Sequence, residues 1–324
     1  MSRHRAKPTE RPPACAPRRP PGPAASVPSV ICACIDIGSN TTRLLVAEPK
    51  DGRLRELLRQ RAFTRVGKNL KGNDRISDKK IAQVAEVVAT QVRVAQELGT
   101  QNIRAVATAA IREAANQEDL AEAIRETAAV AVDVLTDEEE ARLAFVGATR
   151  ALDHAPDGDV AVVDVGGASS EIAVGTVAGG ARWTASFRVG SGVLADAYLR
   201  SDPPSTEELD AARAHVEGAF EGLALAQPEL AIAVGGTATS LRRLAGARLE
   251  HETIERSLRI LASQSVEEVA ARFELEPERV GLLPTGMLIL EQVSDLLGRP
   301  LLIGKGGLRE GVIIDMLARE GVLG

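Results

Sequence analysis

The apolar and polar positions of the chain repeat one pattern: a short apolar run, an aspartate, and a glycine-containing turn that leads into a second apolar run. The pattern occupies residues 31–46, around Asp36, and residues 160–174, around Asp164. Apolar runs rich in β-branched residues on either side of a glycine turn predict a β-hairpin. The two aspartates lie about 130 residues apart, the length of a domain, so we expect one hairpin in each of two similar halves.

The rest of the chain alternates between predicted strands and helices. Apolar residues recur at helical spacing between Ser77 and Gly99, and Ser205 with Glu208 has the pattern of a capping box. Further strands are expected at residues 54–59, 62–66, 103–107, 130–135, 182–189, 231–234 and 301–303, and further helices after residues 107 and 136 and at 204–223 and 312–320. Strands that alternate with helices are typical of an α/β fold.

Two similar halves, each with a turn suited to phosphate, predict a duplicated actin-like (ribonuclease H-like) two-domain α/β fold with the active site in the interdomain cleft. This is the architecture of the actin and sugar-kinase superfamily. We expect the domains at residues 30–146 and 147–324. The last helix, 308–320, belongs to the second domain in sequence and is able to pack back on the first.

Residues 1–29 differ in composition from the rest. They hold 8 of the 16 prolines, six Lys and Arg residues and one acid, without the apolar core of a secretory signal. Such a Pro/Arg-rich tail is expected to be disordered. It is either a basic arm for a polyanion or a stretch upstream of a mis-assigned start codon.

The formal net charge of the whole chain is −6, and the basic tail makes the remainder more acidic still. An acidic surface does not attract nucleic acid, so no nucleic-acid partner is expected. No apolar run approaches the roughly 18 residues needed to span a membrane, so no membrane partner is expected either. A homodimer is compatible with the sequence.

Cysteines and histidines offer no metal-binding pattern. Cys15, Cys32 and Cys34 lack the spacing of metal ligands, and the four histidines are scattered. Cys32 and Cys34 fall on one face of the first strand, so we expect buried, reduced thiols and a cytoplasmic protein.

Three turns rich in glycine and hydroxyl residues are candidate phosphate sites. Glycine lets the backbone approach an anion closely, and backbone N–H groups at a turn or a helix start donate to it. The candidates are Gly38, Ser39, Asn40 and Thr41 in the first hairpin, Gly166, Gly167 and Ser169 in the second, and Gly235, Gly236 and Thr237 before a helix.

Two carboxylates at opposite ends of the second hairpin turn, Asp164 and Glu171, are candidate ligands for Mg²⁺. This cation is usually held by one or two carboxylates plus substrate phosphates. The alternative is a glycine-rich hairpin with incidental acids.

Arg112 and Glu140 each follow a predicted strand at a helix start. Arg112 is either a surface charge or a phosphate clamp. Thr136 and Glu139 form a capping box, which leaves Glu140 without a structural role. A carboxylate at that position, one turn into the helix, could point into a cleft and act as a general base.

These segments together resemble the exopolyphosphatase / guanosine pentaphosphate phosphohydrolase (Ppx/GppA) phosphatase family over residues 31 to about 320, in its short two-domain form. The similar motifs are residues 36–44, 107–116, 138–143, 164–171 and 307–311. The resemblance implies Glu140 as general base, Asp164 and Glu171 as Mg²⁺ ligands, and Arg112 as a phosphate contact. Two positions depart from the family pattern: Thr136-Asp137 stands where Ser-Gly is usual, and Ala168 replaces a glycine.

The resemblance implies a Mg²⁺-dependent hydrolase that releases terminal phosphate from inorganic polyphosphate, an exopolyphosphatase. Because longer relatives carry a further helical domain, we expect short chains to be favoured. The first alternative substrate is the alarmone of the stringent response, guanosine pentaphosphate. A kinase that uses ATP and a non-catalytic sensor of alarmone or polyphosphate are the remaining alternatives. The sequence does not decide between polyphosphate, guanosine pentaphosphate and a nucleoside triphosphate.

Overall fold

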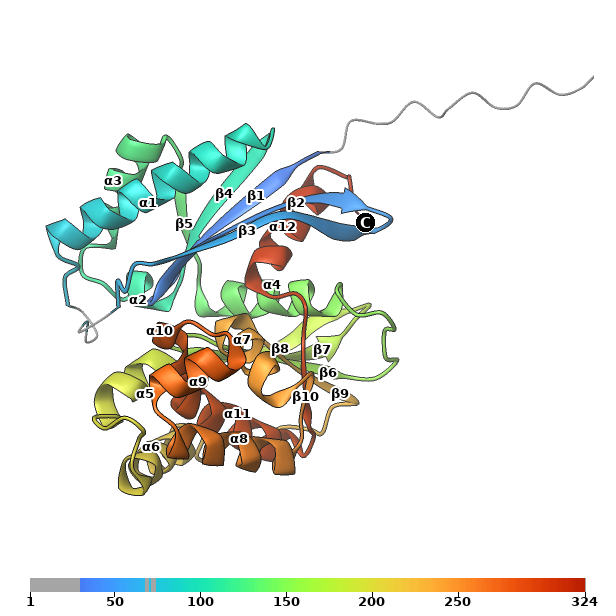
Figure 1. Cartoon of the computed structure of the whole chain (residues 1–324). Helices are drawn as coiled ribbons and strands as arrows, with labels where there is room; N and C mark the ends of the chain where they lie inside the picture. The colour runs from blue at the N-terminus through green and yellow to red at the C-terminus, as the bar shows by residue number, and fades with distance from the viewer. Residues whose placement is uncertain (1–29, 68–69, 71–73, 324) are drawn as a thin grey trace, which may run out of the picture.

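The computed structural model describes residues 30–67, 70 and 74–323 (Figure 1). The expectations for residues 1–29 lie outside the described residues. The described chain forms two lobes, each built on one sheet, with two helices layered between the sheets (Figure 1). The duplicated α/β fold predicted from the two hairpins is therefore confirmed.

The first half of the chain folds into a five-stranded sheet with helices on both sides. Its elements are β1 (Cys32–Ile37), β2 (Thr41–Lys50), β3 (Arg53–Phe63), α1 (Asp78–Glu97), β4 (Asn102–Ala107), α2 (Ala109–Arg112), α3 (Gln117–Ala128), β5 (Val132–Val134) and α4 (Asp137–Thr149). Helices α1 and α3 cover the outer face of this sheet, and an apolar cluster that includes Ile35, Leu44 and Val88 fills the space between them.

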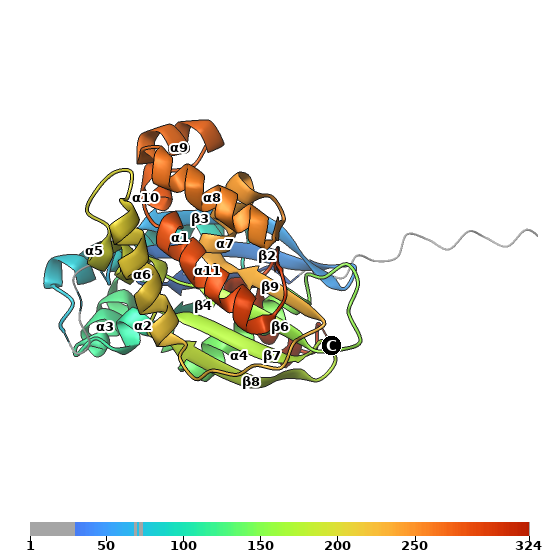
Figure 2. The same ribbon diagram turned by 90° about the horizontal axis from the view of Figure 1, so that it is seen from below.

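The second half folds into a six-stranded sheet with more helices. Its elements are β6 (Val160–Val165), β7 (Ser170–Thr176), β8 (Gly180–Phe187), α5 (Ser191–Tyr198), α6 (Thr206–Ala219), β9 (Leu230–Val234), α7 (Gly235–Ala245), β10 (Arg248–Leu249), α8 (His251–Ser263), α9 (Val266–Phe273), α10 (Pro277–Val280), α11 (Leu283–Leu297), β11 (Leu301–Ile303) and α12 (Leu308–Arg319). Figure 2 shows α6, α8 and α11 together on the outer side of this sheet.

The two sheets share one topology. The first has the strand order β3-β2-β1-β4-β5 and the second β10-β11-β9-β6-β7-β8. In each, three antiparallel strands are followed by two parallel neighbours, and the second sheet adds β10 at its edge, antiparallel to β11. Asp36 pairs with Arg43 in the first hairpin, and Asp164 pairs with Glu171 in the second. This repeated register places both aspartates at the same end of their strands, where α/β folds bind ligands.

Helices α4 and α12 are exchanged between the halves. Helix α12, the last in the chain, packs on the first sheet through Val312, Ile313 and Leu317. Helix α4 instead packs on the second sheet, with Phe145 buried against the strands. The two helices contact each other between the sheets, and glycines at the crossing allow backbone-to-backbone contact, since a Cβ on Gly311 would collide with the carbonyl oxygen of Leu143.

The domain boundary predicted from the sequence stays a prediction, and its position can be described relative to the helices. The division between residues 146 and 147 falls inside α4, which is one continuous helix from Asp137 to Thr149. The apolar face of α4, which covers the second sheet, places this helix with the second lobe. Of the two short strands expected at 54–59 and 62–66, residues 54–63 belong to one strand, β3, which pairs with β2 on both sides of a bulge, and residues 64–66 lie outside it.

Among the described helices, the stretch Pro277–Leu297 has the length and apolar composition of a membrane span, although the sequence analysis expected no such run. The most apolar 18 residues of this stretch are 67% buried. Helix α11 forms the centre of the second lobe and contacts α5, α6, α7 and α8. The core position of this helix accounts for its composition.

Two local predictions are confirmed. Thr136 and Glu139 form a capping box at the start of α4, as do Ser205 and Glu208 at the start of α6. Cys32 and Cys34 are buried and free of disulfides.

Candidate active site

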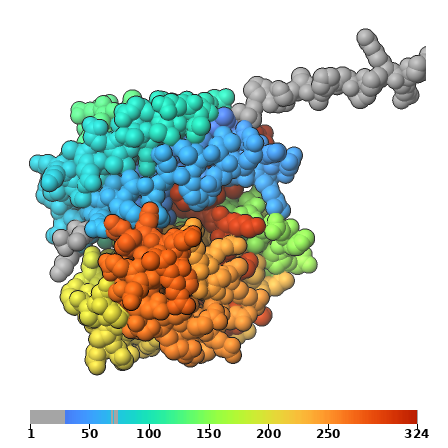
Figure 3. All heavy atoms as spheres, viewed as in Figure 1, coloured from blue at the N-terminus to red at the C-terminus, as the bar shows by residue number. Residues whose placement is uncertain are grey.

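A cleft of about 570 Å³ lies between the lobes. Figure 3 shows it as the hollow between β3 in the first lobe and the orange helices of the second, with residues from the end of the chain exposed inside it. The turns of the two hairpins meet across this cleft, since a Cβ on Gly167 would lie 3.4 Å from Ser39 Cβ and 3.5 Å from Asn40 Cβ. The fold therefore brings the two repeated turns to face one ligand.

All but one of the residues singled out in the sequence line this cleft. They are Gly38, Ser39, Asn40, Thr41, Glu140, Asp164, Gly166, Gly167, Ser169, Glu171, Gly235, Gly236 and Thr237. The exception is Arg112, whose side chain lies behind Glu140. The third turn opens α7, so the N-terminus of an 11-residue helix points toward the cleft, an arrangement that favours anions.

Four carboxylates gather on one side of the cleft: Asp36, Glu140, Asp164 and Glu171. Asp36, Glu140 and Glu171 are buried, and Asp164 is partly buried. The side chains of Asp36 and Asp164 have no hydrogen bond or ion pair with a described residue, whereas the side chain of Glu171 accepts a hydrogen bond of 2.9 Å from Ser186 Oγ. Asp36 had no role in the sequence analysis, although it stands near the end of β1 as Asp164 stands near the end of β6.

Burial and mutual repulsion shift the titration of these acids. Burial raises the pKa of Asp164 to about 6, and the nearby Asp36 adds to the shift. Burial, with the charge of Asp164, raises the pKa of Glu171 to about 7. Burial also raises the pKa of Asp36. The pKa of Glu140 is raised first by burial and then by the charge of Glu171. Buried, mutually repelling acids in a cleft are typical of functional sites.

The donor set fits a divalent cation. Within the described residues, no group of three or more Asp, Glu, His or Cys side chains forms a ready-made metal cage. Mg²⁺ does not need one, because it keeps water and binds through one or two carboxylates plus substrate phosphates. Asp164 and Glu171 are the pair that would hold it, and a bound cation would offset the repulsion that raises the pKa of both.

The cleft also carries cations that the sequence analysis did not single out. They are Arg43, Arg59, Arg61, Arg243, Arg279, Lys305 and Arg309. Arg43 donates from Nε to Thr41 Oγ1 at 2.8 Å, which holds it over the first turn. Arg309 is buried, and its pKa is lowered by burial and by Arg43.

Arg279 is the most unusual of these cations. Its side chain is 5% exposed, and its Nε and Nη2 atoms have no hydrogen-bond partner. Burial, and then the charges of Arg43 and Arg61, lower its pKa well below the usual value. Gly236 leaves room for it, because a Cβ there would collide with Arg43 and lie 2.8 Å from the Arg279 guanidinium. Buried, unpaired donors of one sign are satisfied by an anion.

Different signals were available for these residues. Arg43 lies two positions after Thr41 on β2, so strand alternation places the two side chains on one face. Arg309 belongs to the motif at 307–311. Arg279 follows from no local pattern, because it reaches the cleft from α10 through the packing of α9 and α11.

The comparisons with known proteins agree with this geometry. The family model described as the Ppx/GppA phosphatase family matches residues 45–320. The chain belongs to the Ppx/GppA phosphatase family. The enzyme class expected from the sequence, a phosphoanhydride hydrolase, is thereby confirmed at the level of the family.

One curated relative of this family member is a guanosine-5′-triphosphate,3′-diphosphate pyrophosphatase of Photobacterium profundum. It is 25% identical over 303 residues, which cover 90% of this chain and 60% of the relative. The chain thus spans about three fifths of that relative's length.

Solved structures of the family match over a greater share of their length. The Aquifex aeolicus member of the Ppx/GppA family has a TM-score of 0.77 at 28% identity, over 90% of this chain and 99% of that one. An exopolyphosphatase from Cytophaga hutchinsonii has a TM-score of 0.79 over 91% of this chain and 100% of its own, at 21% identity. The second likeness shows the fold alone.

Proposed function

We propose that this family member is a Mg²⁺-dependent hydrolase that removes the terminal phosphate from inorganic polyphosphate. The observation that carries the proposal is a single cleft in which clustered carboxylates, arginines and the glycine turns lie together. The acids Glu140, Asp164 and Glu171 line the cleft together with Arg43, Arg279 and Arg309. Arg43 and Arg309 lie near enough to Asp164 to oppose the rise in its pKa. A chain of phosphates fits this set of groups, because arginines bind its negative charges and Mg²⁺ held by the acids would offset the charge of its terminal phosphate.

Glu140 is the base in this mechanism. It accepts a proton from a water molecule as the water oxygen forms a bond to the terminal phosphorus. The bond from that phosphorus to the bridging oxygen breaks, and its electron pair stays on the departing chain. The products are inorganic phosphate and a chain shorter by one phosphate, and Glu140 returns its proton to solvent.

The other groups bind and orient the substrate. Backbone N–H groups of the hairpin turns, such as that of Gly167, would donate to the terminal phosphoryl group, and hydroxyl groups such as that of Ser169 would add donors. Mg²⁺ held by Asp164 and Glu171 would supply charge neutralisation at the phosphoryl oxygens.

Guanosine pentaphosphate is the second candidate substrate. It is favoured by the name of the Photobacterium relative, a guanosine-5′-triphosphate,3′-diphosphate pyrophosphatase, and it offers the same terminal phosphoanhydride. A preference for short polyphosphate stays a prediction.

One assay separates the candidates. Phosphate release is measured with polyphosphates of several lengths, guanosine pentaphosphate and ATP, each across a Mg²⁺ titration. A polyphosphate hydrolase gives the highest kcat/KM with polyphosphate, and a higher value with guanosine pentaphosphate would reverse the order of the two substrates. No release from any of the three at any Mg²⁺ concentration would reject hydrolysis and leave the sensor or kinase alternatives.

A further inference from the structure

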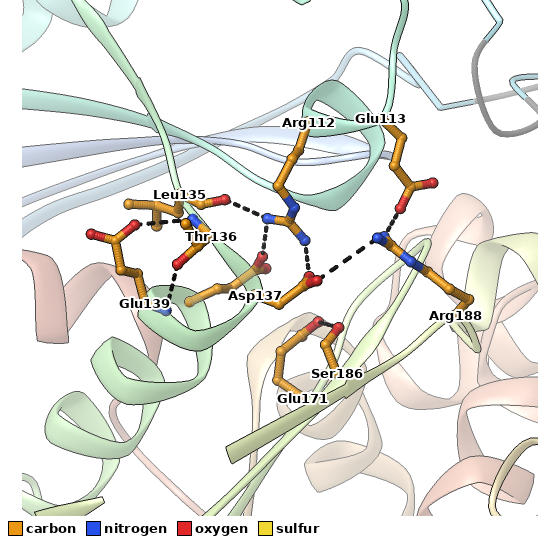
Figure 4. Close-up of polar contacts among 10 residues, drawn as sticks. Arg112, Glu113, Leu135, Thr136, Asp137, Glu139, Glu171, Ser186 and Arg188 are labelled. Carbon is orange, nitrogen blue, oxygen red and sulfur yellow. Dashed lines mark hydrogen bonds and ion pairs between the residues drawn. The ribbon is translucent and has the colours of Figure 1, made fainter. Parts of the chain in front are cut away.

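Arg112 is directed at the carboxylates of α4 rather than at the cleft. It donates to the backbone carbonyl of Leu135 and to Asp137 (Figure 4). Its Nη1 lies 3.4 Å from Glu140 Oε2. Its side chain is 17% exposed. A guanidinium with these partners holds the side chain of Glu140 from behind, on the side away from the substrate.

Asp137 lies between two guanidinium groups. One is Arg112 from the first lobe, and the other is Arg188, which follows β8 in the second lobe and approaches Asp137 to 3.8 Å. Arg188 also forms an ion pair with Glu113 at the end of α2 (Figure 4). A chain of ion pairs therefore runs from the first lobe to the second and returns, through Asp137 and Arg112, to Glu140.

The base needs such support, because its neighbours repel it. Glu140 shares its side of the cleft with Glu171 and Asp164, whose negative charges would turn its carboxylate away when all three are ionised. An opposite charge behind Glu140 counters this repulsion. The backbone that carries Glu140 is also held in place, because the Thr136–Glu139 capping box stabilises the first turn of α4.

We propose that Arg112 and Asp137 are positioning residues for Glu140, and that Arg188 makes this positioning depend on the contact between the two lobes. The proposal rests on the proposed function, in which Glu140 is the base. It replaces the phosphate-contact role that the sequence resemblance implied for Arg112. A displacement of about 1 Å at a catalytic group can cost about 10²-fold in rate, so a lost positioning contact is visible in turnover.

A purely structural ion-pair network would behave differently. Asp137 and Arg188 are 42% and 53% exposed, and exposed pairs contribute little to stability. Their variants should therefore keep the fold, and any loss of turnover must come from the site.

The test is a double-mutant cycle on turnover. Asp137→Asn and Arg112→Met are each combined with Glu140→Gln, and kcat and KM are measured with the best substrate. We expect each single variant to lower kcat by about 10- to 10²-fold with KM nearly unchanged. In the Glu140→Gln background the same changes should cost nothing more, because a positioning residue acts through the residue that is already removed. Arg112→Lys keeps the positive charge but lacks the two-nitrogen geometry of the guanidinium group, so it should recover part of the lost kcat. It replaces Arg112→Met in the cycle if Arg112→Met does not fold.

The link to the second lobe is tested separately. Arg188→Gln should lower kcat by less than Arg112→Met does, and adding Glu113→Gln should cause little further loss. Arg182→Gln is the matched control, since Arg182 lies on β8 and pairs with Asp159 away from the cleft. Equal losses in Arg182→Gln and Arg188→Gln would overturn the role of Arg188.

The outcomes distinguish the two proposals. Wild-type turnover in Glu140→Gln would overturn the proposed mechanism and the positioning role with it. A loss in Glu140→Gln together with wild-type kcat in Arg112→Met would overturn the positioning role alone. A rise in KM at constant kcat in Arg112→Met would do the same, because it would place Arg112 on the substrate.

Discussion

Gly235 lies so close to Asp164 that a Cβ on this glycine would collide with the Oδ1 atom of the carboxylate. The backbone at Gly235 has φ of +85°, a conformation that other residues rarely adopt. The start of α7 thus packs directly against an acid of the second hairpin and limits where its carboxylate can lie.

Gly235→Ala is expected to displace Asp164 and to lower phosphate release by at least about tenfold, with a shift of the Mg²⁺ dependence to higher concentration. Gly246→Ala is the matched control. Gly246 has φ of +87°, and a Cβ there would have nothing within 4 Å, so the variant carries the same backbone strain without touching a carboxylate. Equal activity in the two variants would show that Asp164 tolerates displacement.

Glu140→Gln keeps the size of the side chain but removes the proton acceptor. If Glu140 is the base, turnover should fall by roughly 10²–10⁴-fold while the fold stays intact. If it only places charge at the start of α4, the change should cost about 0.3–1 kcal/mol of stability and leave turnover alone. Glu138 on the same helical turn does not line the cleft and supplies the control variant, Glu138→Gln, which should be nearly silent. Steady-state phosphate release and thermal midpoints separate the two outcomes.

Arg279→Met should weaken substrate binding and stabilise the free protein. The buried guanidinium lacks partners for Nε and Nη2, so methionine removes a desolvated charge, whereas the bound polyanion loses a charge-assisted contact. We expect KM to rise by about 10- to 10²-fold, since hydrogen bonds to charged groups contribute about 1.5–3 kcal/mol. The thermal midpoint should rise as well.

Arg272→Met is the control for this change. Arg272 lies 5.1 Å from the Phe273 ring, much as Arg279 lies 5.9 Å from Phe63, but it does not line the cleft. A lower thermal midpoint for Arg279→Met with an unchanged KM would contradict the assignment.

The clustered acids should make the metal-free protein less stable as pH rises. Asp164 and Glu171 have pKa values of about 6 and about 7 in the folded protein, above their ordinary values of 3.8 and 4.5. The folded state therefore binds more protons than the unfolded state between about pH 4 and 7. The stability that the two protonated acids contribute is fully present at about pH 4 and is lost as the pH rises through about 7.

The measurement is denaturant unfolding of wild type and of the Asp164→Asn/Glu171→Gln variant with a metal chelator present. Between about pH 4 and 7, the free energy of unfolding of the variant should rise relative to that of the wild type, by on the order of a few kcal/mol. Above about pH 7 the difference between the two should stay constant. At pH 8, Mg²⁺ should stabilise the wild type and not the variant. A stability difference between variant and wild type that does not change with pH would contradict the raised pKa values of Asp164 and Glu171.

The sequence predicted those elements whose residue patterns are local, that is, contained within one hairpin or one helix start. The hairpins around Asp36 and Asp164 follow from apolar runs and glycine turns, and the start of α4 follows from Thr136 and Glu139. The candidate phosphate-binding turns lie in these segments or at a strand-to-helix junction, so local reading placed them on the correct elements.

Interactions over long sequence distances could not be predicted in the same way. Arg279 reaches the cleft through helix packing in the second lobe, and no periodicity near residue 279 indicates it. Arg112 follows a helix-start pattern that suits a phosphate contact, yet Asp137 and the Leu135 carbonyl direct it behind Glu140. Such contacts depend on which elements meet, and that is decided by the packing of the whole chain.

The exchange of α4 and α12 has a consequence for cutting the chain. A break between α4 and β6, within residues 150–159, would give one fragment that lacks the helix covering Cys34 and Leu45 and another that lacks the helix covering Val162 and Ile232. Each fragment alone would expose a sheet face to water and should be insoluble. Produced together, the fragments should restore each other's cores by exchanging these helices, and because each supplies one hairpin of the cleft, recovered phosphate release would report their reassembly.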